Sequence, residues 1–219
     1  MDEARERTAA FALAATHAWV ERAVIGLGLC PYARGAQALG RVRTVCSAAR
    51  DEEALLADLA AEIEHVLGSS VQAVETTLLV LPWVLRDFPA YNDFLALADA
   101  TLDALGATGT LQIASFHPDY RFAGTAPDDI SNATNRSPYP ILQLLREASV
   151  SAAVEGGADG ESIAAANIET LRRLGRSRWE RLAAACAADA RRAVGAPGDS
   201  RALSATPGSL PLRRPKALR

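Results

Sequence analysis

The sequence has few of the features that would assign it directly to a known class of protein. Its three cysteines, Cys30, Cys46 and Cys186, are odd in number and widely spaced, which argues against a disulfide framework. No apolar run approaches the ~18 residues that span a bilayer. Residues 1–22 mix charges of both signs and lack a basic start followed by an apolar block, so no secretion signal is expected. We therefore expect a cytoplasmic protein with free thiols and no membrane contact.

The motifs of common nucleotide-binding and hydrolase folds are absent as well. The chain has no Walker, G-x-G-x-x-G or G-x-S-x-G pattern. It has only 3 histidines, and neither a C-x-x-C nor an H-x-x-x-H spacing. The sequence thus predicts no metal site and no other cofactor.

Composition indicates one globular domain followed by a different segment. With 219 residues and a hydrophobic fraction of 49%, the chain can bury a substantial core, and we assign residues 1–194 to a single domain. Residues 195–219 are rich in Pro, Gly and Ser and are predicted to be a disordered basic tail. They hold five of the 23 basic and one of the 26 acidic residues, which leaves an acidic remainder with a net charge of about minus 7. Such a charge does not favour nucleic acid as a partner.

Hydrophobic periodicity predicts alternating helices and strands. Apolar residues recur at helical spacing, with capping residues or glycines at the ends, over residues 4–27, 51–67 and 87–105. Short strand-like runs cover residues 41–46, 76–83 and 110–116, and further helices are predicted near 140–150, 160–174 and 177–193. This order predicts an α/β fold with a small, mostly parallel sheet, crossover helices, an N-terminal helix and a C-terminal helical extension.

The segment of residues 116–140, FHPDYRFAGTAPDDISNATNRSPYP, has no helical or strand period yet is rich in reactive side chains. A connection of this length inside a compact domain is usually functional or disordered. Four aromatic residues argue for order, since a solvated tail could not bury them. The segment also begins at the carboxyl end of a predicted strand, where ligands collect in open α/β sheets. We predict an ordered loop that builds a site, and name it the loop 116–140.

His117 is the first catalytic candidate in this loop. Imidazole titrates near neutrality, and Asp119, two residues later, could orient the ring as a general base. The alternative is a structural histidine that bonds to loop backbone.

Substrate contacts are predicted in the second half of the loop, with one addition from its first half. Amides, hydroxyls and a guanidinium just before a predicted helix suit a carboxylate, phosphate or amide ligand. Arg136 is the expected anchor, and the other candidates are Asn132, Asn135, Ser137 and Tyr120. The alternative is that the two asparagines only hold the backbone of the loop.

Cys30, in the string GLGLCPYA, is the third catalytic candidate. Nearby Arg34 could lower the pKa of its thiol and make it a nucleophile. A simple parallel topology would, however, place it at the amino edge of the sheet, away from His117. The alternative is a buried structural thiol.

Several strings, taken together, resemble a known family. GLGLCPYA, TTLLVLPWVLRDFPAYNDFL, LQIASFHPDYRFAGTAPDDISNATNRSPYPILQLLREAS and NIETLRRLG, in this order, are similar to an uncharacterised bacterial family, domain of unknown function 1415, over roughly residues 11–182. The resemblance implies a shared fold and site but no established activity. Members often carry histidine at the position of Gln143.

Two functions follow from these residues. The first is an enzyme, a hydrolase or group transferase, that acts on a small polar or anionic substrate with His117, Asp119 and Cys30 as catalytic groups. The second is a module that binds a small ligand or partner without chemistry. A base close to a reactive group would favour the enzyme, and an Arg136 pocket without a positioned base would favour binding. Substrate and oligomeric state do not follow from the sequence.

Overall fold

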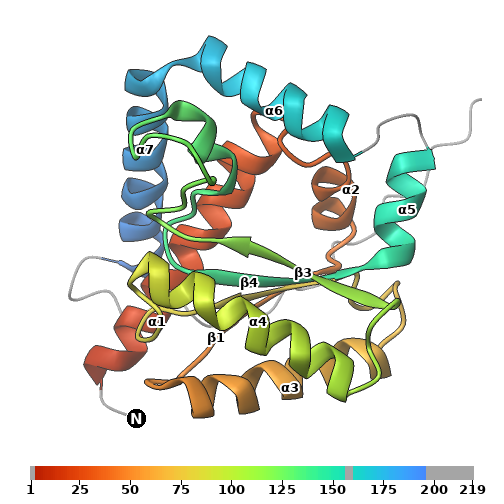
Figure 1. Cartoon of the computed structure of the whole chain (residues 1–219). Helices are drawn as coiled ribbons and strands as arrows, with labels where there is room; N and C mark the ends of the chain where they lie inside the picture. Colours follow the sequence, from red (N-terminus) through yellow and green to blue (C-terminus); the bar gives the residue numbers. More distant parts are fainter. Residues whose placement is uncertain (1–2, 156–159, 196–219) are drawn as a thin grey trace, which may run out of the picture.

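A computed structural model of the chain describes residues 3–155 and 160–195 and places a four-stranded sheet between two layers of helices (Figure 1). The strands are β1 (Val42–Cys46), β2 (Thr76–Val80), β3 (Leu111–Phe116) and β4 (Ile141–Arg146), in the spatial order β1-β2-β4-β3. Only β1 and β2 pair in parallel, and β4 runs antiparallel to both of its neighbours. The predicted α/β class is confirmed, whereas the prediction of a mostly parallel sheet is wrong, because the sheet is mixed.

The error arises at β4, which lies where a helix near residues 140–150 was predicted. Alternate residues of this central strand are buried against opposite helical layers, Leu142 and Leu144 on one face and Ile141 on the other. A strand covered on both faces has an apolar run without clear alternation, which is difficult to distinguish from one or two turns of a buried helix. Because Phe116 pairs with Ile141, the loop 116–140 leaves and re-enters the sheet at the same edge.

Two of the predicted helices cover one face of the sheet. They are α3 (Glu52–Gly68) and α4 (Phe88–Ala104). Each begins where the sequence predicts: Asp51 accepts a hydrogen bond from the N–H of Ala54 at 2.8 Å, and Asp87 accepts one from Ala90 at 3.2 Å. Their apolar stripes pack against the sheet in the larger of the two core clusters.

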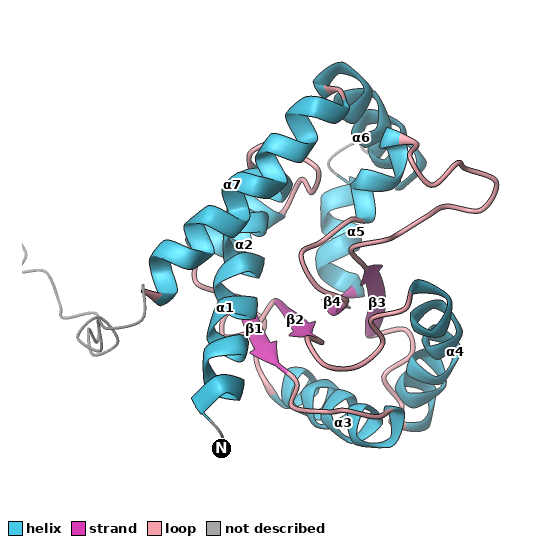
Figure 2. Ribbon diagram, turned by 90° about the vertical axis from the view of Figure 1, so that its left-hand side faces the viewer, coloured by secondary structure: helices cyan, strands magenta, loops and turns pink. Residues whose placement is uncertain are grey.

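The other face is covered by α1 (Glu3–Trp19), the π-helix η1 (Val20–Ile25), the 3₁₀ helix η2 (Ile130–Asn135) and α7 (Arg176–Val194). The predicted helix over residues 4–27 is thus an α-helix that continues as a π-helix. Helices α1 and α7 lie side by side (Figure 2). The remaining helices are α2 (Ala33–Ala38), α5 (Glu147–Glu155) and α6 (Gly160–Leu174). Within the described ranges no helix combines the length and apolar character needed to cross a membrane. The predicted disordered tail lies, except for Gly195, outside the described residues.

Candidate functional site

The loop 116–140 is ordered mainly by hydrogen bonds between its own residues. Asn132 is fully buried, and its side-chain oxygen accepts a bond from the N–H of Phe122 at 3.0 Å. It also shares the hydroxyl proton of Thr125, at 2.8 Å, with the carbonyl oxygen of Phe122. Its amide nitrogen donates to the carbonyl oxygen of Ala126 at 2.9 Å. Every polar atom of this side chain therefore makes a hydrogen bond inside the loop. This contact pattern matches the alternative in which Asn132 holds the backbone of the loop and does not contact a ligand. Phe116 and Phe122 are half-buried.

His117 is also held by backbone groups. Its Nδ1 accepts a hydrogen bond from the N–H of Asp119 at 3.0 Å, so Nε2 carries the proton and donates to the carbonyl oxygen of Leu85 at 3.2 Å. The ring is 0% exposed and packs against Phe88 and Tyr91 of α4, with centroids at 5.4 and 5.2 Å. Burial lowers the pKa of His117, which keeps the ring neutral. The ring is therefore enclosed and does not line either the first or the second of the cavities described below.

Asp119 does not orient the imidazole with its carboxylate. It is exposed, and its hydrogen bond to the ring comes from its backbone N–H. The catalytic roles of His117 and Asp119 stay predictions that this geometry does not support.

His117 ties the loop to the connection that follows β2. Its partner Leu85 has a φ of 53°, a left-handed conformation that costs a residue with a Cβ roughly 1–2 kcal/mol. Nearby, the hydroxyl of Tyr91 donates to the carbonyl oxygen of Ile141 at 2.7 Å and accepts from the N–H of Phe116 at 3.1 Å. These bonds fix both ends of the loop to α4.

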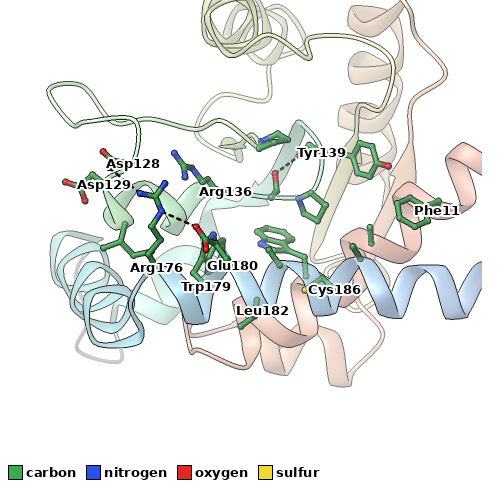
Figure 3. A pocket seen from close by; sticks show the side chains of 18 residues that line it. Phe11, Asp128, Asp129, Arg136, Tyr139, Arg176, Trp179, Glu180, Leu182 and Cys186 are labelled. Carbon is green, nitrogen blue, oxygen red and sulfur yellow. Dashed lines mark hydrogen bonds and ion pairs between the residues drawn. The ribbon is translucent and has the colours of Figure 1, made fainter.

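A cavity of about 420 Å³ lies between the loop, α1 and α7, and we call it the Arg136 cavity. Figure 3 shows aromatic side chains at one end and charged side chains at the other. The aromatic lining consists of Phe11, Trp19, Tyr139 and Trp179, and the charged lining of Asp128, Asp129, Arg136, Arg176 and Glu180. A cavity with an apolar body and a few convergent polar groups is typical of small-molecule sites.

Arg136 and Arg176 differ in their partners. Arg176 forms ion pairs with Asp128 at 3.3 Å and Glu180 at 3.1 Å. Arg136 donates from Nε to the carbonyl oxygen of Tyr120 at 3.2 Å and from Nη2 to that of Pro127 at 2.6 Å. Within residues 3–155 and 160–195 it has no carboxylate partner, and Nη1 has no hydrogen bond. Its positive charge is thus held in place but not neutralised.

Two further predicted contacts lie near Arg136. Ser137 lines the same cavity, but its hydroxyl donates to the carbonyl oxygen of Tyr139 at 2.5 Å. The ring of Tyr120 packs between Phe88 and Phe122, with centroids at 5.3 and 5.1 Å, and is not among the residues that line this cavity.

Cys30 and Asn135 line a second cavity, of about 240 Å³, which we call the Cys30 cavity. It lies on the α1 side of the sheet, whereas the ring of His117 packs on the α4 side. Burial raises the pKa of the Cys30 thiol, which disfavours the thiolate that a nucleophile needs. The structure thus brings Cys30 together with Asn135, and Arg136 with Ser137, but does not bring Cys30 to His117.

Sequence reasoning missed the aromatic wall of the Arg136 cavity. Phe11 and Trp19 come from α1, and Trp179 from α7, far from the loop in sequence. The sequence does contain one signal: Trp179, Leu182 and Cys186 lie three and four residues apart on one stripe of α7. It does not reveal that this stripe faces the loop.

In the part of the chain that the structure describes, no group of three or more His, Cys, Asp or Glu side chains could hold a metal ion.

The comparisons with known proteins place the chain in a family without assigning an activity. The model of the family described as "Protein of unknown function (DUF1415)" matches residues 12–181. The chain therefore belongs to this family. Searches of curated proteins and of solved structures find no match.

Proposed function

We propose that this protein binds a small anionic molecule with an apolar, planar body in the Arg136 cavity, without acting on it chemically. The observation that carries the proposal is the state of Arg136, a fixed guanidinium without a carboxylate partner among the described residues, in a cavity that four aromatic side chains also line. A guanidinium held this way can form charge-assisted hydrogen bonds to a carboxylate or phosphate. The aromatic end supplies apolar surface for the rest of the ligand.

The enzyme hypothesis receives less support from the same geometry. Of the three predicted catalytic residues, His117, Asp119 and Cys30, none lines the Arg136 cavity. Both ring nitrogens of His117 are bonded to backbone groups, so the ring offers no free base. Of the three cavity carboxylates, those of Asp128 and Glu180 are paired with Arg176, and that of Asp129 accepts a bond from the N–H of Ser131 at 2.9 Å.

We also propose the cytoplasm as the compartment and a small molecule, rather than nucleic acid, as the partner. All three cysteines are unpaired, which is typical of a reducing environment. The acidic charge of the chain outside residues 195–219 supports the second proposal.

Calorimetric titration with two matched probes tests the binding proposal. Indole-3-acetate and indole-3-acetamide share an aromatic body and differ in charge. Because a hydrogen bond to a charged group is worth about 1.5–3 kcal/mol, we expect the anion to bind roughly 10- to 100-fold more tightly than the amide. In Arg136→Gln this preference should disappear, and in Arg136→Lys it should weaken, since lysine keeps the charge but loses the planar fork.

Arg121→Gln is the matched control. Arg121 is an exposed arginine of the same loop that does not line the cavity, so its loss removes the same charge without removing the contact. Equal binding of the two probes to the unaltered protein would refute the proposal, and so would an equal effect of the Arg136 and Arg121 variants. Melting temperatures are measured in parallel. If Arg136→Lys has a much lower melting temperature than the unaltered protein but the same affinity for indole-3-acetate, Arg136 stabilises the fold and does not bind the ligand.

A further inference from the structure

The Cys30 cavity differs in chemistry from the Arg136 cavity. It lies between the α1 side of the sheet and the helices η1 and α6, and none of the described residues that line it is charged. Its walls are mostly aliphatic and include Val20, Val24, Leu29, Leu78, Leu145 and Ile163. A charged ligand would find no counter-charge among these described residues, and burying an unpaired charge is unfavourable.

Part of the wall comes from an uncommon backbone conformation. Val20 and Val24 belong to the π-helix η1, whose i→i+5 bonding continues into the bond from the N–H of Gly26 to the carbonyl oxygen of Glu21 at 3.0 Å. Such π-helical turns are rare and occur frequently at functional sites. The helix is therefore irregular at the point where it borders the cavity.

The orientation of two side-chain amides in the cavity wall is fixed by their partners. The hydroxyl of Thr76 donates to the carbonyl oxygen of Leu144 at 2.8 Å, so it can only accept the second bond, at 2.9 Å, from the Nε2 of Gln143. The Nδ2 of Asn167 donates to the carbonyl oxygen of Leu29 at 2.8 Å, and a carbonyl can only accept.

As a consequence, Gln143 and Asn167 each keep an amide oxygen for another donor. Within the described ranges neither oxygen has a hydrogen-bond partner. Both residues are half-buried and line the cavity. The polar groups that the wall leaves available thus include two acceptors in an uncharged, mostly apolar surrounding.

Cys30 and Tyr32 do not add a charge to this surrounding. Burial raises the pKa of both groups, so at neutral pH they are a thiol and a phenol.

We propose that the Cys30 cavity is a second binding site, for an uncharged molecule with an apolar body and N–H or O–H donors that pair with the side-chain oxygens of Gln143 and Asn167. Small primary amides, amino-substituted heterocycles and alcohols have this chemistry. The site does not rest on the function proposed for the Arg136 cavity, since the two differ in charge and in the residues that would hold the ligand.

Nuclear magnetic resonance of the ¹⁵N-labelled full chain, titrated with three probes, tests the proposal. Benzamide is neutral and has N–H donors, N,N-dimethylbenzamide is neutral without donors, and benzoate is charged. We expect benzamide to shift the side-chain amide resonances of Gln143 and Asn167 in a saturable way, with a dissociation constant on the order of millimolar for so small a ligand. The other two probes should shift these resonances at least fivefold less at equal concentration.

Gln143→Met tests the acceptor directly, because methionine keeps the length and apolar stem of the side chain but removes the oxygen. Losing one neutral hydrogen bond should weaken benzamide binding about two- to tenfold. Gln112→Met is the matched control, since Gln112 is an exposed glutamine of β3 that does not line the cavity.

Equal shifts from all three probes, no saturable shift from benzamide, or unchanged benzamide binding by Gln143→Met would each overturn the proposal. If Gln143→Met does not fold, the comparison of the three probes on the unaltered protein decides alone. A failure here leaves the indole-3-acetate test of the Arg136 cavity unaffected, because that test depends on different residues.

Discussion

Replacing His117 separates a structural role from a catalytic one. The ring is fully buried and makes two hydrogen bonds, one to the carbonyl oxygen of Leu85 and one from the N–H of Asp119. A buried backbone group left without its partner costs about 1–3 kcal/mol. Removal of the ring also leaves a cavity among α4 side chains. We therefore expect His117→Ala to lower the free energy of unfolding by about 3–6 kcal/mol.

Two conservative variants each keep one of the two hydrogen bonds of His117 and so separate their contributions to the free energy of unfolding. His117→Gln places an amide nitrogen near the position of Nε2 and keeps the donor to Leu85, while His117→Asn places an acceptor near the position of Nδ1 and keeps the bond from Asp119. The contact with Leu85 is the more deeply buried of the two. We expect His117→Asn to cost about 2–3 kcal/mol and His117→Gln about 1 kcal/mol.

The pH dependence gives an independent readout. Burial lowers the pKa of His117 below its ordinary value of 6.5, so the unfolded chain binds a proton at a higher pH than the folded protein does. The stabilisation is complete above pH 6.5 and is lost as the pH falls through the folded pKa, by at most about 1.4 kcal/mol per pH unit. Urea unfolding at pH 7.5 and pH 5.5 should show this loss in the unaltered protein, and less of it in His117→Gln.

His65→Ala is the control for these measurements, because His65 is an exposed histidine of α3. Its free energy of unfolding should stay within about 0.5 kcal/mol of the unaltered protein. The structural reasoning would be refuted if His117→Ala cost less than 1 kcal/mol, or if its unfolding had the same pH dependence as that of the unaltered protein.

One variant and one reagent test two other predicted site residues, Asn132 and Cys30. Asn132→Ala should lower the free energy of unfolding in urea by about 2–4 kcal/mol, because three hydrogen bonds that fold the loop are lost. Asn92→Ala, on the exposed side of α4, should change it by less than about 0.5 kcal/mol. Similar values for the two variants would contradict this reasoning. The rate at which a maleimide alkylates Cys30 at pH 7.5 can be followed by peptide mass spectrometry. We expect this rate to be at least about tenfold lower in the folded protein than in guanidinium, because burial raises the pKa of the thiol. A faster reaction in the folded protein would restore Cys30 as a candidate nucleophile.

The sequence predicts the long helices on both sides of the sheet because their signals are local. Helices α3 and α4 begin within one residue of the predicted starts, where Asp51 and Asp87 accept capping bonds, and each helix has one apolar stripe. The strand β4 is missed because its signal is not local: Ile141 and Leu142 are apolar for the same reason, burial between two helical layers. Only the pairing with β2 and β3 distinguishes this strand from a helix, and pairing partners do not follow from periodicity.

For the loop 116–140, the sequence predicts where the segment starts but not what its polar side chains contact. The loop 116–140 does begin at the carboxyl edge of β1 and β2, as the order of elements indicates; its return to the same edge at β4 is not predicted. Histidine and asparagine are chosen as candidates for hydrogen-bonding capacity, and His117 and Asn132 use that capacity on backbone groups. Whether a polar side chain faces its own loop or a ligand depends on contacts that the sequence does not show.

Asn135 and Arg136 show how the buried bonds of the loop serve the two cavities. The two residues are neighbours at the end of η2, yet Asn135 lines the Cys30 cavity and Arg136 the Arg136 cavity. Asn135 is fixed by a bond from its Nδ2 to the carbonyl oxygen of Ser115 at 3.1 Å. Trp19 lines both cavities and packs edge-on against Phe116 at 5.3 Å, so it forms part of the boundary between them. The end of η2 and Trp19 therefore separate an uncharged cavity from a charged one. The end of η2 is held by the N–H of His117, which donates to the carbonyl oxygen of Asn135 at 3.1 Å, and by the bond of Asn135 to Ser115.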